Sequence, residues 1–168
     1  MTTLFAQPYD ISATGFYFQS AEDYAEKSAK LENDFGQAVE EFEIQFIDGE
    51  DIDAEVAKAW GIHQGNIAAF LDAVDGWDEH QKLIFIIAVG ECAYSYNPTT
   101  DHPDDFDVDL YEMDEMTDLA EHFVDEGLYG PIPESLIYYI DTHAIARDLS
   151  VDYCQTTIAG KRLIYACR

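Results

Sequence analysis

The chain has a stretch of 64 residues, from Leu83 to Ala146, that contains 15 acidic residues and no lysine or arginine. Over all 168 residues there are 35 acidic and 8 basic side chains, which gives a formal net charge of -27 at pH 7. Repulsion between so many like charges destabilises a compact fold. A high net charge together with few hydrophobic residues is typical of disordered chains. Here 48% of the residues are hydrophobic and 14% are aromatic. We therefore expect a globular protein that builds a core and carries its charge outside.

Solubility does not explain a net charge of this size, because a net charge of roughly 2–8 in magnitude keeps a small domain soluble. A bound cation, a basic partner or a high-salt habitat could each account for it. Halophilic proteins spread their acids widely and tend to contain fewer large apolar residues. This chain keeps 11 tyrosines and 10 phenylalanines, which favours a cation or a basic partner over salt adaptation.

Residues 1–51 are predicted to form an N-terminal α+β domain. The segment EFEIQFID at 41–48 alternates strictly, with Phe42, Ile44 and Phe46 on one side, which is typical of a half-buried strand. Two shorter strands are expected before it. Between them and this strand, Ser20 is placed to cap the start of a helix.

Residues 52–100 are predicted to form a central, all-helical domain. Apolar residues recur there every three or four positions, and glycine-containing connections separate the periodic segments. Asp53 and Asp78 are each expected to cap the N-terminus of a helix. The short connections indicate helices packed antiparallel.

Residues 101–168 are predicted to form a second α+β domain, so that the fold class is α+β. A strand is expected at FDVDLYE, and a helix from about Met113 to Glu126 with a buried apolar stripe. One or two further helices follow, and a terminal hairpin turns near Gly160. The expected stripe consists of Met116, Leu119, Ala120 and Phe123.

The densest acidic segment runs from residue 101 to residue 126, where 12 of 26 residues are acidic. Four of its acids have the spacing i, i+4, i+7 and i+11 and are expected to share one face of the predicted helix: Asp114, Asp118, Glu121 and Asp125. Such a stripe is about 16 Å long, with a carboxylate roughly every 5–6 Å. We predict that the whole set imitates phosphates toward a partner: Asp101, Asp104, Asp105, Asp107, Asp109, Glu112, Asp114, Glu115, Asp118, Glu121, Asp125 and Glu126.

The comparison with DNA can be made quantitative. B-DNA carries about one negative charge per 1.7 Å of its axis, so a charge of -27 corresponds to about 46 Å of duplex. A compact chain of this length has a diameter near 40 Å, by its expected radius of gyration. The charge per unit length is therefore close to that of DNA.

Other chemistry is poorly supported by the residues. The run of alternate acids from Asp105 resembles the start of a calcium loop, but the required glycine and final glutamate are replaced by Leu110 and Met116. Asp118 and His122 could share a metal, although a solvated helix face explains the pair better. No zinc, phosphate-loop or nucleophile-elbow motif is present, and no pair of carboxylates stands out. We expect no catalytic activity, no metal and no cofactor.

The sequence predicts a cytoplasmic protein. The first residues lack a basic region followed by an apolar run, so no signal peptide is expected. The longest apolar run, LIFIIAV at 83–89, is too short to span a bilayer. Anionic lipid and nucleic acid would both be repelled, so neither is expected as a partner.

One segment, PESLIYYIDTHAIARDL at 133–149, resembles the antirestriction motif of the ArdA family. Thr142 stands where that family has an aromatic residue, and Ala146 stands where glycine is common. The resemblance extends more weakly over the whole chain. The matching positions are Leu136, Tyr139, Ile140, Asp141, Arg147, Asp148 and Leu149.

This resemblance implies an elongated, three-domain DNA mimic that is encoded by a mobile genetic element and forms homodimers near the motif. It implies that the partner is a type I restriction–modification enzyme, bound through the methyltransferase core where DNA would lie. Alternatives are an anti-CRISPR mimic that binds a surveillance complex and an acidic cation-binding protein. The motif also has a structural interpretation, since Leu136, Tyr139 and Ile140 could form the buried face of a helix.

Overall fold

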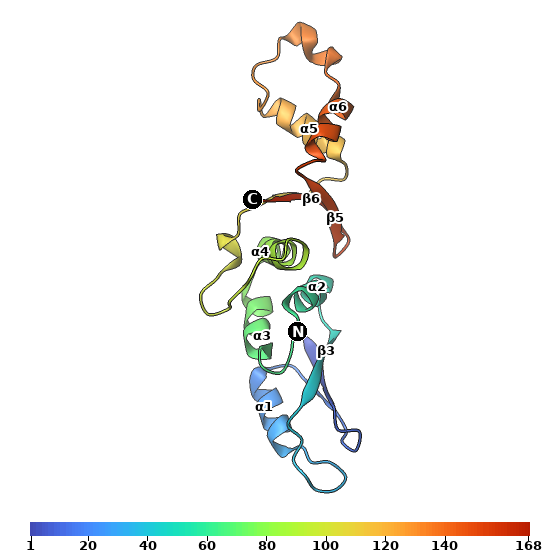
Figure 1. The fold of residues 1–168 in the computed structure, drawn as a ribbon, viewed down its shortest axis with the longest axis vertical. Coiled ribbons are helices and arrows are strands. Elements are labelled where there is room, and N and C mark those ends of the chain that lie inside the picture. Colours follow the sequence, from blue (N-terminus) through green and yellow to red (C-terminus); the bar gives the residue numbers. More distant parts are fainter. The chain divides into compact units, whose positions relative to one another are not determined.

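The computed structural model describes residues 1–168, which form a mixed α+β protein with two three-stranded sheets (Figure 1). The chain divides into two compact units, Met1–Phe106 and Asp107–Arg168. The predicted α+β class is confirmed. The finer division of the first unit, into an α+β domain up to residue 51 and a helical domain up to residue 100, stays a prediction.

The first unit opens with an antiparallel sheet in the order β2-β1-β3, formed by β1 (Thr3–Pro8), β2 (Phe16–Phe18) and β3 (Phe42–Asp48). The alternation predicted for β3 is confirmed at Phe42 and Ile44, which are buried. Helix α1 (Ala21–Lys30) packs Tyr24 against the sheet, with its ring centroid 5.0 Å from that of Phe18. The N-cap expected at Ser20 is also confirmed, because its hydroxyl accepts the N–H of Asp23 at 3.1 Å.

After β3, the regular elements of the first unit are helical (Figure 1). Their core contains large side chains that are fully buried, among them Phe70 and Phe85. The predicted cap at Asp78 is confirmed as a complete capping box with Gln81. The elements are α2 (Asp51–Trp60), α3 (Ile67–Gly76), α4 (Glu79–Phe85), a π-helix (Ile86–Glu91) and a 3-10 turn (Pro103–Asp105).

The cap predicted at Asp53 is wrong. Helix α2 begins at Asp51 with Glu50 as its N-cap, so Asp53 lies in the first turn. Its carboxylate is buried and accepts a hydrogen bond from the Lys82 ammonium of α4 at 2.6 Å. The side chain therefore links two helices, which sequence position alone did not indicate.

The second unit has an antiparallel sheet in the order β4-β6-β5, with β4 (Val108–Tyr111), β5 (Cys154–Ile158) and β6 (Lys161–Cys167). The predicted hairpin is confirmed. Its turn places Ala159 and Gly160 at φ values of 48° and 80°, as a two-residue hairpin turn of the primed type requires. Helices α5 (Met116–Asp125) and α6 (Thr142–Leu149) and a 3-10 helix (Glu134–Tyr139) complete the unit (Figure 1).

The predicted apolar stripe of α5 is confirmed. Leu119, Ala120 and Phe123 are buried, and Met116 packs against the same core, which β6 also lines. The helix nevertheless begins at Met116, three residues later than predicted. Its start is fixed by Asp118, whose carboxylate accepts the N–H of Glu115 at 2.9 Å.

No helix of the structure combines the length and the apolar character that a membrane-spanning segment needs.

Candidate partner-binding surfaces

The 12 carboxylates predicted as phosphate mimics, from Asp101 to Glu126, are here called the acidic segment. Those up to Asp105 belong to the first unit, and those from Asp107 onward belong to the second. Ten of the 12 residues are exposed, whereas Asp101 and Asp109 are half-buried. The segment therefore supplies solvent-facing charge on both units, and each unit has its own set.

Several carboxylates of the acidic segment are held in place by backbone N–H groups. Asp101 accepts the N–H of Asn97 and the hydroxyl of Thr100, both at 2.8 Å, and these bonds hold its pKa below the usual value. Asp105 accepts the N–H of His102 at 2.9 Å. Because such bonds restrict the side chain, these carboxylates are presented in fixed positions rather than on freely rotating stems.

Two members of the segment are paired with cations from β6 and the residue after it. Asp109 binds the Arg168 guanidinium at 2.7 Å, and this contact raises the pKa of Arg168. Glu112 lies 3.5 Å from the Lys161 ammonium. Sequence reasoning missed both pairs, since the partners are about fifty residues apart along the chain. These two carboxylates are less available to an outside cation.

The predicted four-acid stripe on one helix face is wrong at its first member. Asp114 precedes α5 and has no helical position, because the helix starts at Met116. Asp118, Glu121 and Asp125 do lie within α5 at helical spacing, and all three are exposed. Like charges at this spacing destabilise a helix by a few tenths of a kcal/mol per pair. The buried apolar face of α5 offsets that penalty.

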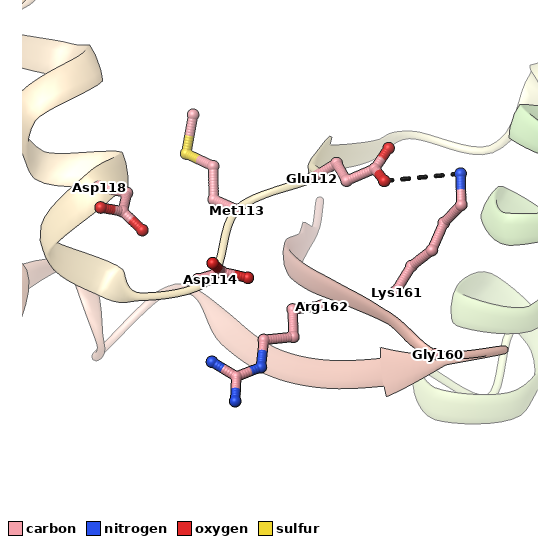
Figure 2. Close-up of a pocket in the computed structure, with 7 residues that line it drawn as sticks. All are labelled: Glu112, Met113, Asp114, Asp118, Gly160, Lys161 and Arg162. Atoms are coloured by element: carbon pink, nitrogen blue, oxygen red, sulfur yellow. Dashed lines mark ion pairs between the residues drawn. The ribbon is translucent and has the colours of Figure 1, made fainter.

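Figure 2 shows a pocket of the second unit where the segment meets basic side chains. Its volume is about 570 Å³, and it is lined by Glu112, Met113, Asp114, Asp118, Gly160, Lys161 and Arg162. The two cations partly offset the charge of the three carboxylates there. Three further carboxylates near the end of α5 are exposed and do not line this pocket: Glu121, Asp125 and Glu126.

The acids are dispersed rather than gathered. Nowhere in the 168 residues do three or more His, Cys, Asp or Glu side chains come together in an arrangement that could hold a metal ion. Asp118 and His122 both lie on α5, but no third ligand joins them. The carboxylates are therefore separate charges and do not form one cluster.

The motif at 133–149 begins with a 3-10 helix whose apolar side chains face solvent. Leu136 is 52% exposed, Tyr139 is 83% exposed and their neighbour Tyr138 is 93% exposed. The interpretation of Leu136, Tyr139 and Ile140 as a buried helix face is thus wrong within one chain, where only Ile140 is half-buried. Exposed aromatic side chains of this size commonly mark protein interaction surfaces.

The second half of the motif has mainly structural contacts. Asp141 caps α6 by accepting the N–H of Ala144 at 3.0 Å. Leu149 packs against the core formed with α5 and β6. Arg147 and Asp148 are exposed. The motif therefore combines an anchored helix with an uncovered apolar segment before it.

Comparison with known proteins decides the family. A family model described as antirestriction protein (ArdA) matches residues 10–161. The chain belongs to the ArdA antirestriction family. A search of curated proteins finds no match. The ArdA family match covers both units, so the resemblance first seen in the motif holds for nearly the whole chain.

Membership of the ArdA family indicates an inhibitor of restriction, with restriction enzymes as the class of partner. The family match does not select individual residues. The acidic segment and the motif residues therefore remain the candidate contacts, on the grounds of their exposure and charge.

Proposed function

We propose that this ArdA protein is a DNA mimic that fills the DNA-binding channel of type I restriction–modification enzymes. In doing so it would protect the incoming DNA of a mobile element. The observation that carries the proposal is the exposure of ten carboxylates of the acidic segment in a chain with only 8 basic residues. An inhibitor with this surface needs no chemical reaction, because occupancy of the channel is enough.

The physical basis is the charge that DNA-binding channels present. Lysine and arginine side chains contact the phosphates and supply much of the affinity for DNA. Carboxylates held on helices and capped turns lose little conformational entropy when they meet such a channel. Opposite charge also speeds association and makes it sensitive to salt.

We further propose that the protein forms a homodimer through the uncovered apolar segment of the motif. The support is the exposure of four large apolar side chains in sequence, each at least 51% exposed: Leu136, Ile137, Tyr138 and Tyr139. Removing such a surface from water contributes roughly 25 cal/mol per Å². A second copy of the chain brings the same apolar surface, so the contact is self-complementary in character.

The test is displacement of labelled DNA from a purified type I methyltransferase, measured by the fluorescence anisotropy of the DNA. The protein should release the DNA competitively, and the competition should weaken when salt is raised from low to moderate concentration. A basic DNA-binding protein unrelated to restriction serves as the control for selectivity. If the methyltransferase keeps its DNA at saturating inhibitor, the proposed mechanism is refuted.

A further inference from the structure

The first unit has a pocket of about 420 Å³ between α3 and the segment that follows the π-helix. We propose that this pocket, here called the Trp77 pocket, binds an arginine side chain of the target enzyme. The inference rests on the proposed function, because it assumes a partner whose DNA-binding surface presents arginine. An arginine bound in this pocket would be a specific contact, in addition to the general attraction between the carboxylates and a basic channel.

Aromatic rings form one wall of the Trp77 pocket. The rings of Trp77 and Tyr96 meet edge to face, with centroids 6.0 Å apart and an interplanar angle of 81°. Behind them, Trp60 and the fully buried Phe85 pack against Trp77 at 5.7 and 5.1 Å. Trp77 and Tyr96 are themselves half-buried, so they are fixed from behind and partly open in front. A cation placed over the face of such a ring is attracted by the negative charge of its π system.

Carboxylates stand beside the rings. Asp72 of α3 is exposed, and Asp101 is held in place by its bonds to Asn97 and Thr100. Burial raises the pKa of Tyr96, and the Asp101 carboxylate raises it further, which places that charge near the ring. No lysine or arginine lines the pocket. The His102 imidazole also lines it, with its ring centroid 6.4 Å from that of Trp77. The chain thus places two carboxylates beside the Trp77 and Tyr96 rings and supplies no lysine or arginine of its own.

Arginine fits this combination better than lysine does. Its guanidinium is planar, so it can stack on an aromatic ring while its edge donates two hydrogen bonds to a carboxylate. An ammonium is more strongly hydrated and cannot stack in this way. Carboxylates alone would attract any cation, whereas rings and carboxylates together select the guanidinium.

The floor of the pocket is built from small residues on one face of α3. Ala69, Ala73 and Gly76 follow one another at spacings of four and three. A Cβ added at Gly76 would meet no atom within 4 Å, and the residue has no positive φ. A longer side chain can therefore be placed there without strain, and because Gly76 lines the pocket we expect it to reduce the space open to a ligand.

The first arm of the test uses the full chain and needs no target enzyme. N-acetyl-argininamide is titrated into isotope-labelled protein, and the indole N–H of Trp77 is followed by NMR. We expect a saturable shift, which the neutral citrulline analogue does not produce and Gly76→Gln abolishes. An absent shift, or an equal shift with the citrulline analogue, would overturn the proposal.

The second arm measures displacement of DNA from the type I methyltransferase. Asp72→Asn should weaken the inhibitor about tenfold, as expected for loss of a charge-assisted contact. Its matched control is Asp75→Asn, which removes the same charge from the same helix outside the pocket and should cost less than about twofold. Equal effects of the two changes, or an unaltered Gly76→Gln, would reject the pocket as a contact.

The two arms separate the possible failures. If the wild-type protein displaces no DNA, the proposed function fails, and the arginine titration still decides whether the pocket binds a guanidinium. If the wild-type protein displaces DNA but the pocket variants behave like the control, the proposed function stands and this inference is wrong.

Discussion

The buried ion pair between Asp53 and Lys82 leads to a sharp prediction about stability. The two side chains are 8% and 7% exposed, and their charged atoms are 2.6 Å apart. Lys82→Met keeps most of the side-chain volume but leaves the Asp53 carboxylate buried without its cation. Breaking a buried pair in this way costs about 3–5 kcal/mol. Since domains are stable by about 5–15 kcal/mol in total, the variant should lose roughly a quarter or more of its free energy of unfolding.

The effect should come from the unpaired charge and not from the loss of the lysine as such. The double variant Asp53→Leu with Lys82→Met replaces both charges by apolar groups, so it should recover to within about 1–2 kcal/mol of the wild type. Urea unfolding followed by tryptophan fluorescence measures all variants, because Trp60 and Trp77 both lie in the first unit with the ion pair.

The double-mutant cycle then gives the coupling energy of the pair directly. A single variant that loses less than about 1 kcal/mol would refute the reasoning. So would a double variant that is as unstable as the single one. The result also concerns the Trp77 pocket, since α2 and α4 supply the rings that support Trp77 from behind.

Three further predictions concern the second unit. Changing Glu121, Asp125 and Glu126 together to amides should weaken DNA displacement about threefold to a hundredfold, at roughly 0.2–1 kcal/mol per exposed charge. If one of the three single changes had the full effect, the charges would not share the binding of the partner. Tyr139→Asp should convert the proposed dimer to a monomer in light scattering, and a persisting dimer would exclude this surface. Gly160→Val should lower the melting temperature through a strain of about 1–2 kcal/mol at φ 80°, and an unchanged value would show that the turn can rearrange.

Sequence patterns predicted the elements whose cause is local. Strand β3 was found because half-buried strands alternate, and the hairpin was found because apolar runs flank Gly160. The buried stripe of α5 followed from its helical period, and the caps at Ser20 and Asp78 followed from residue type. In each case the residues that decide the structure lie within a few positions of one another.

The wrong predictions depend on contacts and exposure that a local sequence pattern does not reveal. Asp53 resembled a cap, but its partner Lys82 is 29 residues away in the sequence. The predicted start of the helix at about Met113 lies three residues before that of α5, because the start depends on the Asp118 carboxylate, which accepts the N–H of Glu115. Leu136 and Tyr139 of the motif are exposed. Residues of the same types also form buried helix faces, so the sequence pattern does not distinguish the two cases.

The sequence predicts the charge of the candidate site and the family of the protein, but not the ion pairs and neighbours of individual carboxylates. Composition indicates an acidic protein, and the resemblance of the motif indicates the antirestriction family. Composition did not indicate that Asp109 and Glu112 are paired with Arg168 and Lys161. It also did not separate Asp101, which borders an aromatic pocket, from the other acids of its segment.

A cryo-electron microscopy structure of this protein bound to a type I methyltransferase would show whether the inhibitor occupies the DNA channel. We expect exposed carboxylates of the acidic segment to lie against the lysine and arginine side chains that otherwise hold DNA phosphates. A complex in which the inhibitor binds outside the DNA channel, with that channel still open to DNA, would contradict it.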